Sequence, residues 1–194
     1  MKFIPKTLAG VYELELEKIS DSRGYFARQW CRKEFAREHI DFEPVQMSTS
    51  GNTERGTLRG LHFQWPPSLE AKLVSCTSGK VCDVVVDLRP DSHTFMQHHC
   101  VELDADKKNM LYIPHGVAHG YQTLSDSAQV SYVMSDYFAP ELSDGVRYDD
   151  PAFGVSWPLA VTRIADRDAS YKDFDPDEHC ARYRKTATTG HSSS

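Results

Sequence analysis

Apolar and polar residues alternate along most of the chain in short runs, which is the two-residue period of half-buried β-strands. In the segment 11–17, VYELELE, Tyr12 and Leu14 fall on one side and glutamates on the other. Turn-forming Gly, Pro, Asp and Ser separate further runs at 44–50, 57–64, 72–77, 81–88, 98–103, 110–113, 121–124 and 129–134. The pattern predicts an antiparallel β-sandwich or barrel.

Helical periodicity is rare in this sequence. The best candidate is residues 32–39, where Phe35 faces inward, and this short surface helix depends on tertiary contacts. Asp21–Gly24 predicts a turn. Residues 186–194, TATTGHSSS, contain no apolar residue larger than Ala and are predicted to be a frayed tail. Because no linker or repeat interrupts the rest, residues 1–185 are expected to form one domain.

Length and charge narrow the possible functions. The 194 residues are 40% hydrophobic and 26% charged, which is typical of a soluble globular protein and not of a disordered chain. A net charge of −6 argues against a nucleic-acid-binding or anionic-membrane surface, so an anionic ligand must be small and bind a local basic pocket. With no membrane-spanning run and no apolar secretion signal, we expect a cytoplasmic protein.

The five cysteines are scattered and never form a CxxC pair; they are Cys31, Cys76, Cys82, Cys100 and Cys180. Such spacing suggests neither a disulfide framework nor a thiolate zinc site, so buried free thiols are predicted.

Two histidine segments are the main candidates for chemistry, since the chain has no phosphate-binding glycine loop, nucleophile elbow or HExxH motif. His62 lies in the predicted strand LRGLHFQ, and His119 ends the segment IPHGVAH. Pro114, Gly116 and His119 match the PxGxxH core of the second motif of cupin barrels. A metal-binding cupin also has an HxH pair on an earlier strand, but Gln64 stands two residues after His62. A metal site is therefore not expected.

Six segments, in order along the chain, resemble the dTDP-4-dehydrorhamnose 3,5-epimerase family. They are 21–26, 58–64, 71–74, 79–89, 113–120 and 157–159. The resemblance implies an all-β, cupin-type jelly-roll barrel of antiparallel strands with a few short peripheral helices. It also implies a homodimer that binds a dTDP-4-keto-6-deoxy sugar and inverts C3 and C5 without a cofactor.

This chemistry needs few groups. The C4 ketone acidifies the protons on C3 and C5, so a positioned base generates an enolate with its charge mainly on O4. Inversion requires an acid on the opposite face of the ring, and a cation near O4 lowers the barrier. By resemblance, His62 is the base, Tyr132 the acid, Asp168 the partner of the histidine, and Lys72 the cation beside the ketone.

The resemblance also implies a set of substrate-binding residues: Arg23, Phe26, Gln46, Ser48, Arg59, Lys72, His119 and Phe138. Arg23 and Arg59 are expected to pair with diphosphate oxygens, and Phe138 to stack on the thymine. The chain departs from the family pattern at Phe138, Ser48 and Ser143, where tyrosine, asparagine and glutamate are common. These departures bear on the choice of sugar more than on catalysis.

Other interpretations remain open. The same groups serve a single-centre epimerase acting at C3 or C5 only, and a non-catalytic sugar-binding cupin or a metal-dependent cupin oxygenase or isomerase are further alternatives. Without the resemblance, His62 and Tyr132 are ordinary core residues, and Lys72 a solvated strand end. Asp83 and Asp87 share a strand face and are interpreted as structural. Strict alternation separates Arg59 from His62, so one site for both requires the strand to twist or bulge, which Gly60 permits.

Overall fold

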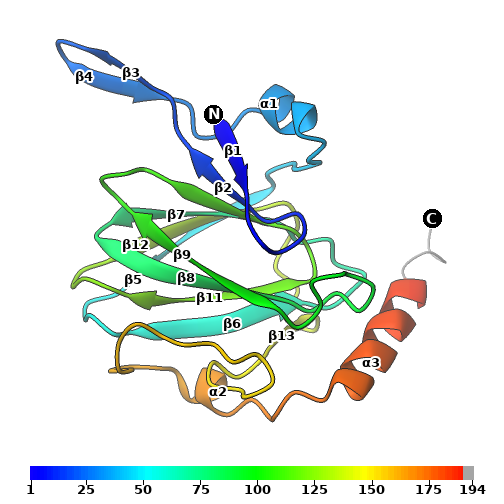
Figure 1. Ribbon diagram of the computed structural model, residues 1–194. Helices are drawn as coiled ribbons and strands as arrows, with labels where there is room; N and C mark the ends of the chain where they lie inside the picture. The colour runs from blue at the N-terminus through cyan, green and yellow to red at the C-terminus, as the bar shows by residue number, and fades with distance from the viewer. Residues whose placement is uncertain (190–194) are drawn as a thin grey trace.

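Two antiparallel β-sheets face each other in the computed structural model, which describes residues 1–189 (Figure 1). The first sheet has the order β1 (Lys2–Pro5), β2 (Tyr12–Glu15), β10 (Met110–Ile113), β7 (Lys72–Ser78), β12 (Gln129–Met134) and β5 (Gln46–Gly51). The second has the order β13 (Ser143–Gly145), β6 (Leu58–Gln64), β11 (Val117–Thr123), β8 (Lys80–Asp87) and β9 (His98–Asp104). The predicted all-β architecture is confirmed.

A separate hairpin of β3 (Lys18–Asp21) and β4 (Gly24–Ala27) projects from the sandwich (Figure 1). Its turn is the predicted one at Asp21–Gly24, but the alternation did not predict its two strands. Their side chains are mostly exposed, so neither strand shows the apolar face on which that prediction depends.

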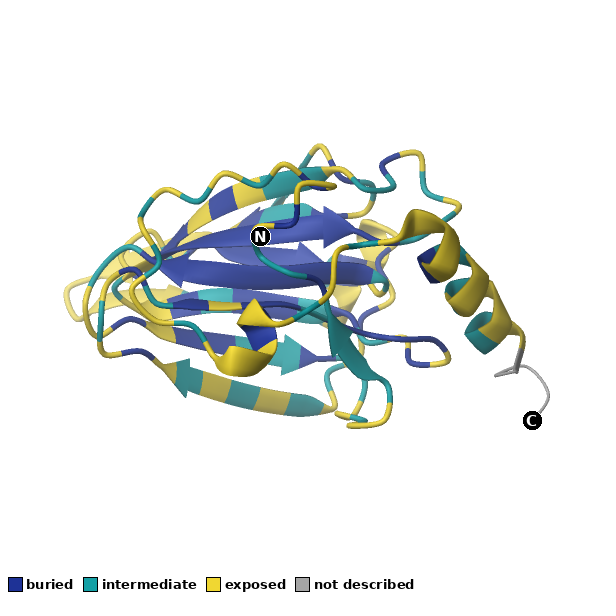
Figure 2. Ribbon diagram, turned by 90° about the horizontal axis from the view of Figure 1, so that it is seen from below, coloured by how far each residue is buried: buried dark blue, intermediate teal, exposed yellow. Residues whose placement is uncertain are grey.

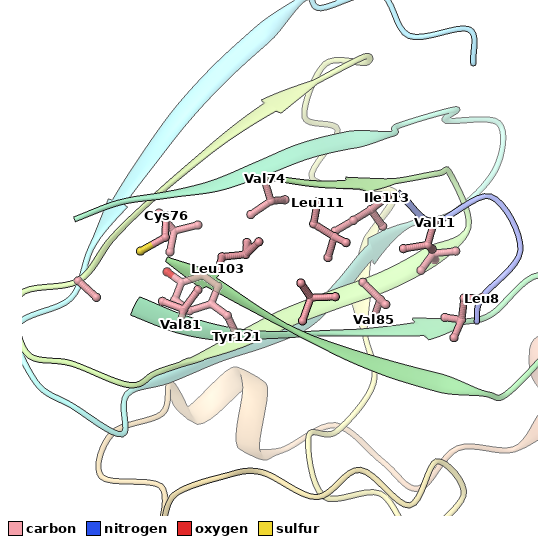
Figure 3. Close-up of a cluster of buried hydrophobic side chains, with 14 of the residues drawn as sticks. Leu8, Val11, Val74, Cys76, Val81, Val85, Leu103, Leu111, Ile113 and Tyr121 are labelled. Atoms are coloured by element: carbon pink, nitrogen blue, oxygen red, sulfur yellow. The ribbon is translucent and has the colours of Figure 1, made fainter. Parts of the chain in front are cut away.

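Hydrophobic side chains, most of them aliphatic, form a core between the sheets (Figure 3). Val74 and Leu111 of the first sheet belong to the same buried cluster as Val85 and Leu103 of the second. The outer face of β8 is also covered, because Val84 packs in a second cluster with residues from the C-terminal third of the chain. Since both faces are covered, every residue of β8 after Lys80 is buried, and the central strands are the most buried part of the molecule (Figure 2).

In the described part of the chain, three helices lie at the periphery: α1 (Arg32–Arg37), α2 (Asp166–Ala169) and α3 (Pro176–Thr189). In α1, the predicted helix, Phe35 is buried among aromatic rings. The prediction of a frayed tail from residue 186 is wrong for 186–189, which continue α3. Contacts of His179 and Tyr183 with Trp65 hold this helix against the sheet, and the helical conformation continues from there through the later residues. Residues 190–194 lie outside the described part.

Within residues 1–189, no helix has the length and apolar character needed to cross a membrane.

One pair of cysteines departs from the prediction of free thiols. Cys82 on β8 and Cys100 on β9 form a disulfide with a Cα–Cα distance of 6.4 Å. Val84 is the direct cross-strand partner of Cys100, so the two cysteines are diagonal neighbours. Because strand register brings them together across 18 residues of sequence, spacing alone did not reveal the pair. Cys31, Cys76 and Cys180 are free, as predicted, but only Cys76 is buried, and the other two are partly exposed.

Asp87 has a structural role at the end of β8. Its buried carboxylate accepts hydrogen bonds from Arg89 Nε (2.8 Å), Ser92 Oγ (2.6 Å) and Thr94 Oγ1 (2.6 Å). Arg89 in turn donates to the carbonyl oxygen of Ala9, which ties β8 to the loop before β2. Burial alone raises the pKa of Asp87, but these hydrogen bonds outweigh it, so the pKa lies below the usual aspartate value.

This lowered pKa predicts acid sensitivity. The stabilisation is fully present above the unfolded-state pKa of about 3.9 and is lost as the pH falls through the lower folded-state value. Asp87→Asn should reduce the free energy of unfolding at pH 7 by about 2–4 kcal/mol and flatten its decline below about pH 4. Urea unfolding of both proteins at pH 7 and pH 3 measures this. An equal acid-induced loss in the two proteins would show that Asp87 does not contribute to it.

Candidate active site

A cavity of about 1110 Å³ opens between the two sheets. One wall is formed by β5, β7 and β12, and the opposite wall by β6 and β11. The segment from Thr162 to Asp168, including the start of α2, lines it as well. A parallel bridge between Thr57 and Arg163 brings this late segment beside β6. The cavity contains every predicted catalytic residue: His62, Tyr132, Asp168 and Lys72.

His62 and Asp168 form a hydrogen-bonded pair. His62 Nε2 lies 2.7 Å from Asp168 Oδ1, and the Gly60 amide donates to Oδ2 at 3.0 Å. Burial by itself raises the pKa of Asp168, but the hydrogen bonds from His62 and Gly60 outweigh it, so the pKa lies below the usual value. Because a carboxylate only accepts, it holds the proton on Nε2 and leaves the lone pair on Nδ1. His62 is thereby arranged as a base.

A bulge brings Arg59 and His62 into the same cavity. Arg59 lies opposite Tyr121 and His62 opposite His119, so β6 uses one more residue than β11 over this interval. Gly60 adopts a φ of 114°, and a Cβ there would lie 2.6 Å from the Cα of the facing glycine on β11. The close approach therefore requires glycine. Of the two expected irregularities, a twist or a bulge, the structure has the bulge.

Tyr132 and Lys72 face His62 from the other sheet. Tyr132 lies on β12, and Lys72 begins the neighbouring β7. The Lys72 ammonium is largely buried and lies 3.3 Å from a carboxylate oxygen of Glu70. The imidazole and the phenol therefore come from opposite walls of one cavity, with an ammonium group on the phenol side.

Five of the other predicted binding residues also line the cavity: Gln46, Ser48, Arg59, His119 and Phe138. Arg59 is oriented by hydrogen bonds from Nε to the Asn52 side chain (2.8 Å) and from Nη2 to the carbonyl of Gly51 (3.3 Å). Phe138 lies at the rim with 55% of its surface exposed, and its amide donates to the side chain of Gln46 at 3.2 Å.

Arg23 and Phe26 are not brought to this cavity. Both belong to the projecting hairpin, where Arg23 forms an ion pair with Asp21 at 2.6 Å. Phe26 is 62% exposed. Their role in binding stays a prediction.

Comparison with known proteins identifies the family. The family model for dTDP-4-dehydrorhamnose 3,5-epimerase matches residues 5–176. The chain belongs to the dTDP-4-dehydrorhamnose 3,5-epimerase family. A curated relative of that name from Sinorhizobium fredii is 36% identical over 171 residues, covering 88% of each chain.

Solved structures of this epimerase family share the fold. One is the 3,5-epimerase RmlC of Legionella pneumophila in complex with dTDP-4-keto-L-rhamnose, with 34% identity and a TM-score of 0.82 over 89% of this chain and 92% of that one. Another is ChmJ, a 3′-monoepimerase from Streptomyces bikiniensis in complex with dTDP-quinovose, with 29% identity and a TM-score of 0.81 over 93% and 89%. The predicted cupin-type jelly roll is confirmed.

The epimerase cavity has three charged residues that the sequence did not single out: Glu70, Arg163 and Arg167. Arg167 Nη2 donates to the Ser143 carbonyl at 3.2 Å, and Arg163 forms an ion pair with Glu54. Arg167 directly precedes Asp168 in the sequence. This adjacency is the sequence feature that could have identified Arg167 as a cavity residue.

Among the described residues of this family member, no group of three His, Cys, Asp or Glu side chains is placed to hold a metal ion.

Proposed function

We propose that this protein is a cofactor-independent epimerase that converts dTDP-4-dehydro-6-deoxyglucose to dTDP-4-dehydro-L-rhamnose by inverting C3 and C5. The observation that carries the proposal is the placement of His62, backed by Asp168, and Tyr132 on opposite walls of one cavity. An epimerase needs a base and an acid on opposite faces of the sugar ring, and this arrangement supplies both.

The proposed reaction moves one proton at each centre. His62 Nδ1 removes the proton from the carbon beside the ketone, and the electron pair of that C–H bond passes into an enolate with its charge on O4. The Lys72 ammonium stabilises that charge, while Asp168 stabilises the imidazolium. Tyr132 then donates its phenolic proton to the opposite face of the carbon. Exchange with solvent removes the proton from His62 and returns one to Tyr132.

The nucleotide part of the substrate is proposed to occupy the rest of the cavity. Arg59 and His119 supply donors to the diphosphate, Gln46 and Ser48 supply polar contacts, and Phe138 supplies an exposed ring for the thymine. A volume of about 1110 Å³ accommodates a nucleotide sugar.

Arg59→Ala is expected to weaken binding of dTDP about 10- to 100-fold, because it removes charge-assisted hydrogen bonds. Isothermal titration with dTDP measures the affinity, and kcat at saturating substrate should change much less. Unchanged affinity would assign the diphosphate to another residue.

We also propose that the protein is a homodimer in which the β3–β4 hairpin of one copy covers the cavity of the other. Ile19 and Phe26 are cross-strand partners, 70% and 62% exposed, on a two-stranded unit that is marginal without support. Met47 on the edge strand β5 and Tyr137 near the cavity rim present further exposed apolar surface. Docking of the hairpin there would carry Arg23 and Phe26 to a bound nucleotide.

Ile19→Asp tests the dimer, since a charge on the buried face of such an interface costs several kcal/mol. We expect a dimer for the wild type and a folded monomer with a raised KM for the variant, by analytical ultracentrifugation and steady-state kinetics. A monomeric wild type of full activity would contradict the proposal.

Proton NMR of the 4-keto sugar nucleotide incubated with the protein in deuterium oxide is the decisive test of the reaction. Deuterium at both C3 and C5 supports the 3,5-epimerase. Deuterium at one carbon supports a single-centre enzyme, the alternative that similarity to the monoepimerase ChmJ favours. No exchange at either carbon would refute the epimerase function.

A cytoplasmic location is also proposed, on the ground that nucleotide sugars are supplied there. The Cys82–Cys100 disulfide argues the other way, because disulfides are rare in that compartment. Cell fractionation, with mass spectrometry of the two cysteines, tests the location and the disulfide together.

A further inference from the structure

A second imidazole–carboxylate pair lies next to the His62–Asp168 pair. His119 on β11 is the direct cross-strand partner of His62, and both line the cavity. The Nδ1 atom of His119 lies 3.3 Å from each carboxylate oxygen of Asp83 on β8. The two residues are diagonal neighbours, since Tyr121 is the register partner of Asp83.

Asp83 is fully buried and has few partners. Val81 and Val85, on the same face of β8, belong to the apolar cluster between the sheets. Within residues 1–189, His119 is the only side chain that forms a hydrogen bond or ion pair with Asp83, and Oδ2 has no hydrogen-bond partner. A buried carboxylate is costly unless something compensates it. Asp87, by contrast, is held by three side chains at the end of the strand.

The contact determines which nitrogen of His119 is available. The carboxylate of Asp83 only accepts, so Nδ1 carries a proton, and it points to Asp83, which does not line the cavity. Nε2, on the other side of the ring, is left for a ligand. His62 is arranged in the opposite sense, because its Nε2 is held by Asp168 and its Nδ1 is free.

We propose that Asp83 is a positioning residue for His119, which fixes the ring so that Nε2 meets the nucleotide sugar. The identity of that ligand rests on the proposed function. Asp83 therefore acts on binding through His119, whereas Asp168 acts on the reaction through His62.

Asp83→Asn is the direct test, because an amide has the same shape but carries no charge and can donate as well as accept, so it no longer dictates which nitrogen of His119 carries the proton. With dTDP as the probe in isothermal titration, we expect Kd to rise about tenfold, with a similar rise in KM and kcat within about threefold. Asp104→Asn is the matched control. Asp104 is a buried aspartate of the same sheet paired with Lys80 at 2.9 Å, away from the cavity, so its loss should leave Kd unchanged.

A double-mutant cycle separates positioning from general destabilisation. If Asp83 acts through His119, Asp83→Asn should have no further effect on dTDP affinity in a His119→Gln background. An equal effect in both backgrounds would overturn the inference, as would an unchanged Kd in the single variant.

Nitrogen-15 NMR of the wild-type histidine rings provides a test that needs no variant to fold. We expect a proton on Nδ1 of His119 and on Nε2 of His62. A neutral His119 protonated on Nε2 overturns the inference. Failure of the wild type to bind dTDP would instead refute the proposed ligand, and the ring signals would still decide whether Asp83 orients His119.

Discussion

Replacing His62 by alanine should lower kcat about 10²- to 10⁴-fold, the usual contribution of a general base. The expectation follows from the position of His62 in the cavity and from the Asp168 contact at 2.7 Å, which leaves Nδ1 free to accept a proton. The same variant should fail to introduce deuterium at C3 or C5, because proton removal precedes both inversions. Steady-state kinetics and NMR in deuterium oxide measure the two effects.

Binding of dTDP is the control for His62→Ala. With 37% of its side chain exposed, His62 is not a core residue, so His62→Ala should stay folded and bind dTDP with near-normal affinity. Asp168→Asn is the companion variant and should lose activity while the imidazole is still present. Near-normal turnover by His62→Ala would remove this residue from the mechanism.

Tyr132→Phe should reduce product formation by a similar factor but spare proton removal, since the phenol acts only after the enolate has formed. We therefore expect deuterium to enter recovered substrate while the rate of inversion falls about 10²- to 10⁴-fold. The ratio of exchange to inversion, measured by NMR, distinguishes an acid from a base.

Packing provides the control for Tyr132→Phe. Tyr132 packs against the cluster between the sheets, and phenylalanine retains the ring, so stability should be preserved. Exchange and inversion that fall together would show that Tyr132 does not serve as the reprotonating acid. Wild-type rates of both would show that its hydroxyl is dispensable.

The sequence predicted the central strands well, because burial of one face or of both leaves a pattern within the strand itself. Alternation of apolar and polar residues marks β2, and the run of valines marks β8. The hairpin and the Cys82–Cys100 disulfide were missed for a common reason. Neither leaves a periodic signal within one segment, since the hairpin has no buried face in this chain and the disulfide depends on register between strands.

Most of the cavity was predictable by resemblance, but its internal contacts were not. His62, Tyr132, Lys72 and Asp168 were each named from motifs, and the structure places them in one cavity. Glu70 lies in no recognised motif, although it is within contact distance of Lys72. Pairings of this kind depend on side-chain direction at strand ends, which one-dimensional patterns do not encode.

The extra residue in β6 does more than bring Arg59 and His62 into one cavity, because it also frees the Gly60 amide to bind Asp168. In a regular strand the amide of Gly60 would be committed to the neighbouring strand or to solvent, whereas here it donates to Asp168. Shortening the strand by one residue would restore an even ladder and leave Arg59 and His62 pointing the same way. It would also remove the Gly60 hydrogen bond, one of the two contacts that hold the Asp168 carboxylate. A more regular strand would therefore hold His62, the proposed base, less firmly in place.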